Sequence, residues 1–135
     1  RDFAFYSCTV PGFEQHVLAR FMGEGHFERH LNRMRTVYKA KHDALVTALE
    51  QSALRNRLRL TGKNVGLHFL LRLEGRLNER QMVERARQEG VAIAGLSEFY
   101  SQKRNVPKNT VVIGFADLAT PKIPALVAAL EKAWA

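Results

Sequence analysis

The stretch Val65-Gly66-Leu67-His68-Phe69-Leu70-Leu71-Arg72-Leu73 is a nearly continuous apolar run, and the turn residues Glu74-Gly75-Arg76 follow it. Such runs are typical of a central strand in a sheet whose faces are covered. Just before it, Leu58 and Leu60 alternate with arginines, which predicts a half-exposed strand ending at Thr61-Gly62. We therefore expect a sheet around residues 65–73, with His68 as a core histidine rather than a ligand.

The residues after this turn predict a helix, two strands and a second helix. Asn78 can cap the first helix, whose buried face carries Met82, Val83 and Ala86 and whose C-cap is Gly90. The strands are expected at Val91–Ala94 and Val111–Phe115. Thr120 is expected to cap the last helix, with Pro121 in its first turn and Trp134 near its end.

Two further helices are expected before the first strand. Pro11-Gly12 opens one, and Gly23 to Gly25 end it. The next runs from His26 to about Ser52, and one stripe of it carries the apolar residues Phe27, Leu31, Met34, Tyr38, Leu45 and Leu49. The element order predicts an α+β fold in one domain, residues 1–135, with a long N-terminal helix and helices on one face of a small mixed β-sheet.

The amino-acid composition leaves several classes of function open. Of the 135 residues, 46% are hydrophobic and 25% charged, as in an ordinary globular protein. The net charge of +8 leaves nucleic acid, an anionic cofactor, or acidic surfaces of a parent protein as partners. No apolar run is long enough to cross a bilayer. With one cysteine, no signal peptide and no initiator methionine, we expect a cytoplasmic piece of a longer protein.

No set of residues predicts a self-contained active site. His26 and His30 have a spacing that can bind one metal ion, but no third ligand is evident, and solvated or capping histidines are the preferred interpretation. Cys8 lies on an extended arm, the glycines form no phosphate-binding loop, and the 13 carboxylates are scattered over helix surfaces. We expect no catalytic residue and no metal site in this chain.

A basic flank on the long helix is the main argument for nucleic-acid binding. Its members could follow phosphates; they are Arg29, Arg33, Arg35, Lys39 and Lys41. The chain lacks the RNA-recognition signature, and the basic helix has no helix-turn-helix partner. A solvated or interdomain face is therefore the preferred interpretation of this flank.

Five segments carry a family resemblance over nearly the whole chain: residues 5–11 with 13–15, 21–30 with 32–35, 66–71, 90–91 leading to 96–100, and 113–118. The most specific string lies in the second of them and reads Glu24-Gly25-His26-Phe27-Glu28-Arg29-His30 with Arg33-Met34-Arg35. Together they resemble the C-terminal small subdomain of the MocR/GabR-type regulators. These bacterial GntR-family proteins join a winged-helix DNA-binding domain to a fold-type I aminotransferase-like domain. The strand segments are also similar to other aminotransferases.

This resemblance implies a parent that binds pyridoxal phosphate, forms a homodimer and switches transcription when an amine or amino acid reacts with the cofactor. The Schiff-base lysine of that fold lies upstream in a Ser-x-Ser-Lys-like stretch, and no lysine here has that context. The winged helix that would contact DNA is also missing. We therefore expect this piece to bind no cofactor by itself and to pack against the parent's large aminotransferase-like domain.

The resemblance also implies which residues border the parent's cofactor cleft. In aminotransferases the small domain supplies an arginine for the substrate carboxylate, which would align near Val112. Valine there means that another arginine serves, or that the ligand is not a typical α-amino acid. We further expect the N-terminal arm with Tyr6, and the loop with Ser97, Phe99 and Tyr100, to border the cleft. Alternatively, Phe99 and Tyr100 simply pack beneath the loop 101–109.

Three functions therefore stay open at this point. The first is a fragment of a pyridoxal phosphate-dependent transcription regulator, inactive by itself. The second is the C-terminal domain of a genuine aminotransferase. The third is a stand-alone basic module that binds nucleic acid, for which tight and steeply salt-dependent duplex binding would be the sign.

Overall fold

The computed structural model describes residues 10–62, 66–102 and 105–135. The chain divides into two compact units, Arg1–Val37 and Tyr38–Ala135. Helix α1 spans Gly12–Gly23 and helix α2 spans His26–Gln51, so both helices expected before the first strand are confirmed. No helix in the described part of the chain is long and apolar enough to span a membrane.

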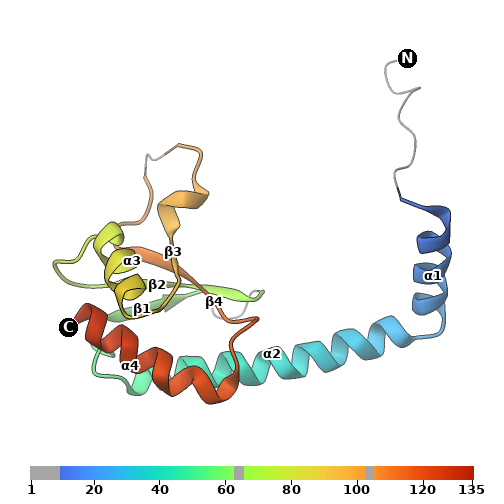
Figure 1. The fold of residues 1–135 in the computed structure, drawn as a ribbon, viewed down its shortest axis with the longest axis horizontal. Helices are drawn as coiled ribbons and strands as arrows, with labels where there is room; N and C mark the ends of the chain where they lie inside the picture. Colours follow the sequence, from blue (N-terminus) through green and yellow to red (C-terminus); the bar gives the residue numbers. More distant parts are fainter. Residues whose placement is uncertain (1–9, 63–65, 103–104) are drawn as a thin grey trace. The chain divides into compact units, whose positions relative to one another are not determined.

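The second unit is built on a four-stranded sheet. Its strands are β1 (Leu58–Thr61), β2 (His68–Leu73), β3 (Ala94–Gly95) and β4 (Thr110–Gly114), in the order β1-β2-β4-β3 (Figure 1). All of these pairings are antiparallel. The α+β class is thus confirmed, but the expectation of a mixed sheet was wrong. β2 and β3 do run in the same direction; β4 inserts between them and pairs antiparallel with both.

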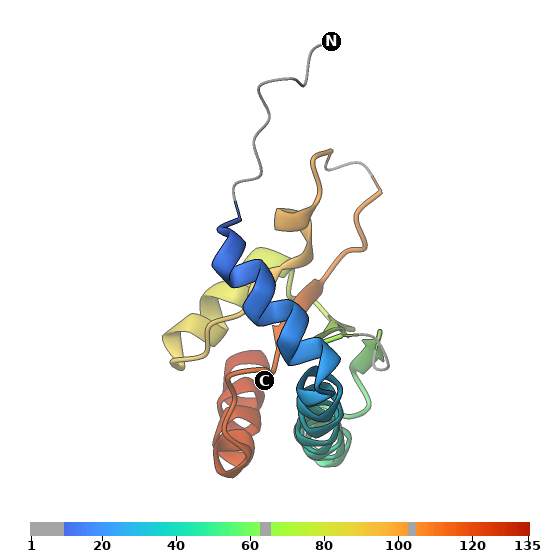
Figure 2. The same ribbon diagram turned by 90° about the vertical axis from the view of Figure 1, so that its right-hand side faces the viewer.

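One face of the sheet forms the core. Every second residue of the central strands points into it, namely Phe69, Leu71 and Leu73 of β2 with Val111 and Ile113 of β4, and all are buried. Helices α3 (Glu79–Gln88) and α4 (Ile123–Trp134) and the C-terminal part of α2 cover this face (Figures 1 and 2). Burying each large apolar side chain there contributes about 1.5–3 kcal/mol.

Trp134 is the largest fully buried side chain of the second unit. Its indole Nε1 donates a hydrogen bond to the carbonyl oxygen of Met82 in α3, at 3.1 Å. Its own carbonyl accepts from Arg57 Nη1, also at 3.1 Å, just before β1 begins. This one residue therefore connects α4 with α3 and with the segment that enters the sheet.

Local capping chemistry explains where α3 begins and ends. The side chain of Asn78 accepts from Gln81 N while the Gln81 side chain accepts from Asn78 N, a complete capping box. Gly90 follows the last residues of the helix with a φ of 78°, which favours glycine. The predicted start is confirmed, and the predicted glycine stop lies one residue beyond the C-cap, Glu89.

Three other expectations were wrong. Val91–Ile93 is not a strand, because Val91 N donates back to Ala86 O at the end of α3, and β3 begins only at Ala94. Thr120 does not cap the last helix, because the short 3-10 helix η2 (Thr120–Lys122) precedes α4. His68 is exposed at the start of β2 rather than satisfied in the core, because it lies on the sheet face that no helix covers.

The first unit has little burial of its own. No residue of α1 is buried, and Phe13 of this helix is 78% exposed. In α2 the apolar stripe is buried at Leu45 and Leu49, in the second unit, whereas Leu31 in the first unit is exposed. The predicted apolar stripe of α2 is therefore buried only in its C-terminal part.

Candidate functional site

The sheet face opposite the helices is the candidate site, and we call it the open face. The alternation of the strands assigns to it Arg59, Thr61, His68, Leu70, Arg72, Ala94, Thr110, Val112 and Gly114. Its middle is apolar and half-buried, because Leu70 of β2 lies directly opposite Val112 of β4, and Val112 lies opposite Ala94 of β3. Charged side chains lie toward the β1 edge.

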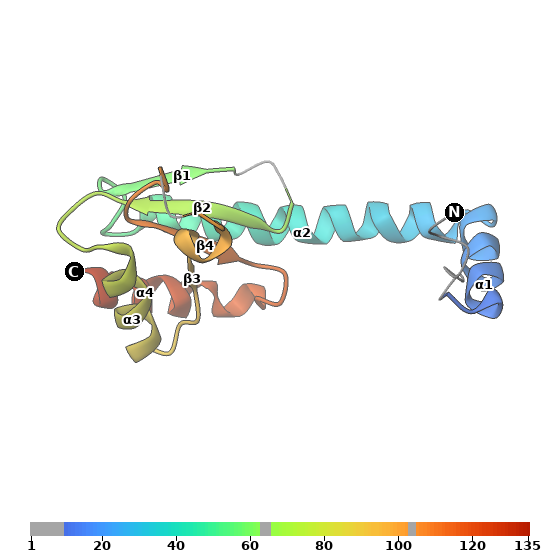
Figure 3. The same ribbon diagram turned by 90° about the horizontal axis from the view of Figure 1, so that it is seen from above.

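A short 3-10 helix, η1 (Leu96–Phe99), stands over one end of the open face. It follows β3 directly and rises on the side of the sheet opposite α2 and α4 (Figures 1 and 3). It contacts both β3 and β4. Thr110 belongs to the open face, yet it is only 3% exposed, and its hydroxyl donates to the carbonyl of Lys108 at 3.0 Å. The end of the open face near Thr110 is therefore covered, while the middle is accessible.

Glu79 at the start of α3 fixes η1 in place. Its carboxylate accepts from Ser97 N at 3.2 Å and from the Ser97 hydroxyl. The same carboxylate lies where a side chain at Gly95 would begin, so a larger residue there would require the Glu79 side chain to move. Glu98 completes the turn by accepting from Gly95 N at 2.9 Å. These bonds hold the residues that follow Ser97 in a defined position.

The predicted cleft residues divide into two groups. Ser97 is half-buried and bonded to Glu79, so it holds the loop rather than facing solvent freely. Phe99 and Tyr100 are 66% and 42% exposed, so neither is packed away. Val112 is half-buried in the middle of the open face. Tyr6 lies outside the described residues, as do Phe3, Phe5 and Cys8 of the N-terminal arm.

Two arginines on the open face were not predicted as site residues. Arg59 of β1 and Arg72 of β2 lie directly opposite each other across the strand pair. Arg59 Nε forms an ion pair with Glu74 Oε1 at 3.1 Å. Arg72 is exposed and has no ion pair within the described residues. The alternation of Arg57 and Arg59 with leucines was the sequence signal that this face carries charge.

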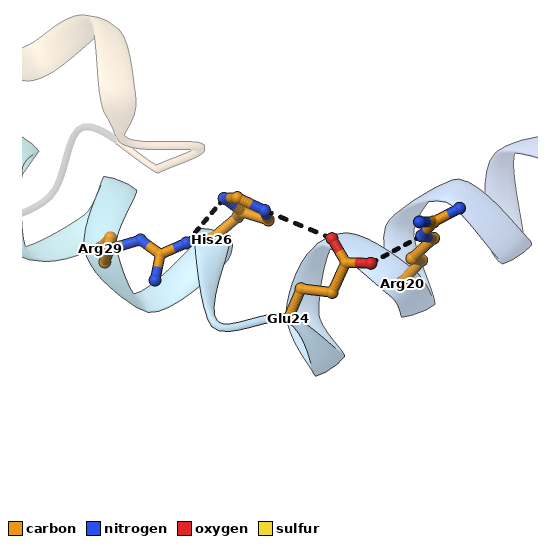
Figure 4. A network of polar contacts seen from close by, with 4 residues as sticks. All are labelled: Arg20, Glu24, His26 and Arg29. Carbon is orange, nitrogen blue, oxygen red and sulfur yellow. Dashed lines mark hydrogen bonds and ion pairs between the residues drawn. The ribbon is translucent and has the colours of Figure 1, made fainter.

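The turn between α1 and α2 carries a separate polar network, drawn in Figure 4. Glu24 accepts from Arg20 Nε at 2.7 Å and pairs with His26 Nε2 at 3.3 Å, while Arg29 Nη2 lies 2.8 Å from His26 Nδ1. Because Arg29 can only donate, His26 Nδ1 accepts and the ring proton is on Nε2. The described residues contain no group of three side chains able to hold a metal ion, and His30 takes no part in this network.

A second charged group lies on α2 near the core. Lys39 Nζ donates to Asp43 Oδ2 at 2.5 Å, and His42 Nδ1 lies 3.0 Å from Asp43 Oδ1. The bond from Lys39, and then that from His42, hold the pKa of Asp43 below its usual 3.8. The His42 ring packs edge-on against Phe69 and Phe115. This group therefore belongs to the packing of α2 and not to the open face.

The described lysines do not fit the role of a residue that binds pyridoxal phosphate covalently on the open face. Lys41 Nζ donates to the carbonyl of Ala116 at 2.7 Å, and Lys39 and Lys132 form ion pairs with Asp43 and Glu89. Lys108 is exposed just before β4, and Lys122 is exposed at the end of η2. No lysine among the described residues projects from the open face, so no step through the cofactor is derived from this chain.

The sequence of this chain is similar to those of known transcription regulators. No family model matches the chain. It is 36% identical over 127 residues to the HTH-type transcriptional regulator YhdI of Bacillus subtilis, an overlap that covers 94% of this chain and 26% of the regulator. It is also 28% identical over 104 residues, 77% of this chain, to the probable rhizopine catabolism regulatory protein MocR of Rhizobium meliloti, where it covers 20%.

Among solved structures, the α-aminoadipate aminotransferase LysN of Thermus thermophilus, complexed with N-(5'-phosphopyridoxyl)-L-leucine, has the same fold over 88% of this chain and 30% of the enzyme. The TM-score is 0.72 and the identity 28%. The chain thus spans about a quarter of the length of the curated relatives it matches. The chain is homologous to the MocR/GntR-type HTH regulators and to fold-type I aminotransferases, in the region of their C-terminal small domain.

Proposed function

We propose that this chain is the C-terminal effector and cofactor-domain fragment of a pyridoxal phosphate-dependent transcription regulator of the GntR/MocR type, inactive by itself. The observation that carries the proposal is the 36% identity to a transcriptional regulator over 94% of the chain. The likeness to an aminotransferase complexed with a phosphopyridoxyl amino acid supports the cofactor. On this proposal the open face and η1 form one wall of the ligand cleft of the parent.

The residues present would give that wall its chemistry. Leu70 and Val112 would contribute an apolar floor, and Phe99 and Tyr100 would contribute aromatic surface held at the rim by the bonds between Ser97 and Glu79. Binding sites for small ligands commonly combine such apolar lining with a few placed polar groups. When bound, pyridoxal phosphate supplies the reaction with amines, and the lysine that holds it would come from the parent's large domain.

The partners follow from the same proposal. The chain would pack against the large aminotransferase-like domain, the parent would be a cytoplasmic homodimer, and DNA would be contacted only through a winged-helix domain outside this chain. The exposed apolar side chains of α1, such as Phe13, Val17 and Phe21, are consistent with a surface that another part of the assembly covers.

The test compares this chain with the full-length natural product. Each is mixed with pyridoxal phosphate, reduced with borohydride, dialysed and analysed by mass spectrometry for a pyridoxyl-lysine. We expect a stoichiometric adduct on one lysine of the full-length protein and none on this chain. A specific adduct on one lysine of the isolated chain would refute the inactivity of the fragment.

A genuine aminotransferase is the second candidate, and the structural likeness to LysN favours it. The two candidates differ in what lies upstream and in turnover. A regulator would bind an operator duplex and change that affinity when an amine is added. Sustained transamination of amino acids, without duplex binding by the full-length protein, would instead support the enzyme.

A further inference from the structure

The open face carries an uncompensated positive charge beside an apolar floor. Arg59 and Arg72 occupy directly opposite positions of β1 and β2, and like charges at such positions repel each other. Glu74, which follows the end of β2, pairs with Arg59. Among the described residues, Arg72 has no acidic partner and stays exposed on a central strand.

The surroundings of Arg72 define what it could bind. On its own strand Leu70 precedes it on the same face, and across β4 it lies opposite Thr110, whose buried hydroxyl is engaged with Lys108 O. Val112 is the diagonal neighbour of Arg72, because it is two residues beyond Thr110 on the same face. Side chains at such diagonal positions are about 7–8 Å apart, within reach of a long arginine.

We propose that Arg72 is an anion-recognition residue that binds the carboxylate of a small ligand whose aliphatic part lies on Leu70 and Val112. An arginine has a rigid fork of donors that matches a carboxylate with two parallel hydrogen bonds. The half-buried pair beside it offers apolar contact to the carbon chain.

The inference deepens the proposed function and rests on it for its biological meaning. Valine at position 112 removes the arginine that the family resemblance implies there. Arg72 lies on the same face, one diagonal step away, and would restore a carboxylate contact from β2 instead of β4. The ligand of the regulator would then be an amine that carries a carboxylate, shifted toward β1 relative to an α-amino acid held at position 112.

The first experiment uses this chain and butyrate as the probe. The arginine Nε–H signals are followed by ¹⁵N NMR during titration with butyrate at constant ionic strength, and butyramide serves as the uncharged control of the same shape. We expect a saturable shift of the Arg72 signal with butyrate and none with butyramide. Acetate should bind more weakly, because it lacks the carbons that contact Leu70 and Val112.

Variants identify the residue responsible. Arg72→Gln should lower butyrate affinity about ten-fold or more, as expected for loss of charge-assisted hydrogen bonds. Arg72→Lys keeps the positive charge but loses the forked pair of donors, so its butyrate affinity should lie between those of wild type and Arg72→Gln. Arg59→Gln is the matched control and should change affinity less than two-fold, since Glu74 already neutralises that arginine. An equal loss in both glutamine variants, equal binding of butyramide, or no saturation would overturn the proposal.

The second experiment separates this inference from the proposed function. The full-length protein with pyridoxal phosphate is titrated calorimetrically with pairs of amines that differ only in a carboxylate. If wild type distinguishes the pairs and Arg72→Gln distinguishes them equally well, the role of Arg72 is refuted while the regulator remains. If the full-length protein binds no cofactor but the chain binds butyrate through Arg72, the proposed function fails and the anion site stands.

Discussion

Replacing Glu79 with alanine should release η1 without unfolding the domain. Glu79 accepts two hydrogen bonds from Ser97, one from the main chain at 3.2 Å and one from the hydroxyl. A hydrogen bond to a charged group contributes about 1.5–3 kcal/mol, and partial exposure of Glu79 places each of these at the lower end. We therefore expect local opening of η1 to become about 2–3 kcal/mol easier, a change of roughly 30- to 150-fold in the opening equilibrium.

Hydrogen exchange measures this directly. The amide of Tyr100, which bonds to Ser97 O, and the amide of Ser97 should exchange faster in Glu79→Ala, whereas amides of β2 should change little. Global stability, followed in urea by the fluorescence of the single tryptophan, should fall by only about 1–2 kcal/mol.

Glu84 supplies the matched control for this prediction. It lies exposed on the same helix, and Glu84→Ala should leave both measurements within about 0.5 kcal/mol of wild type. Unchanged exchange at Ser97 and Tyr100 in Glu79→Ala would refute the idea that this carboxylate holds the loop.

Three further predictions concern the rest of the chain. Trp134→Phe removes the bond to Met82 O and some buried volume, so urea unfolding followed by circular dichroism should show a loss of about 1–3 kcal/mol; no loss would mean that the indole is not a core contact. Because the pKa of Asp43 is lowered on folding, its stabilisation is present above about pH 4 and lost as pH falls through the folded pKa. Asp43→Asn should thus be less stable than wild type at pH 7, and the difference should shrink as the pH falls below about 4; a difference that stays constant over this range would contradict the assignment. Phe13→Ser should reduce self-association in sedimentation runs at high concentration, because the Phe13 side chain is 78% exposed. A wild-type chain that stays strictly monomeric at that concentration would contradict the idea that the exposed apolar side chains of α1 drive association.

Elements with local signals were predictable from the sequence. The capping box at Asn78 and the period of Met82 and Ala86 place α3 because each contact lies within a few residues along the chain. The apolar runs likewise placed β2 and β4, and glycines placed the end of α1. In each case the residues that decide the structure are neighbours in sequence.

Features that depend on distant residues were not predictable. The insertion of β4 between β2 and β3 made the sheet antiparallel, and one uncovered face left His68 exposed rather than buried. For the candidate site, the family resemblance predicts that the loop of Phe99 and Tyr100 borders a cleft, and this stays a prediction. Its anchor, Glu79, was not anticipated, because the bonded residues are 18 positions apart and an acid in the first turn of a helix is ordinary.

The arrangement of the core also bears on how the polypeptide matures. Trp134 bonds to Met82 across 52 residues, and Leu49 of α2 belongs to the same buried cluster as Leu130 of α4. During synthesis the pair of β1 and β2 can form early, but its apolar side is covered only in part, by α2, until α3 and α4 have been made. Closing so long a loop is slow compared with making a hairpin. A nascent chain of this kind is therefore exposed to aggregation between the synthesis of β2 and that of α4, and chaperones that shield unfinished sheets should act on it in that interval.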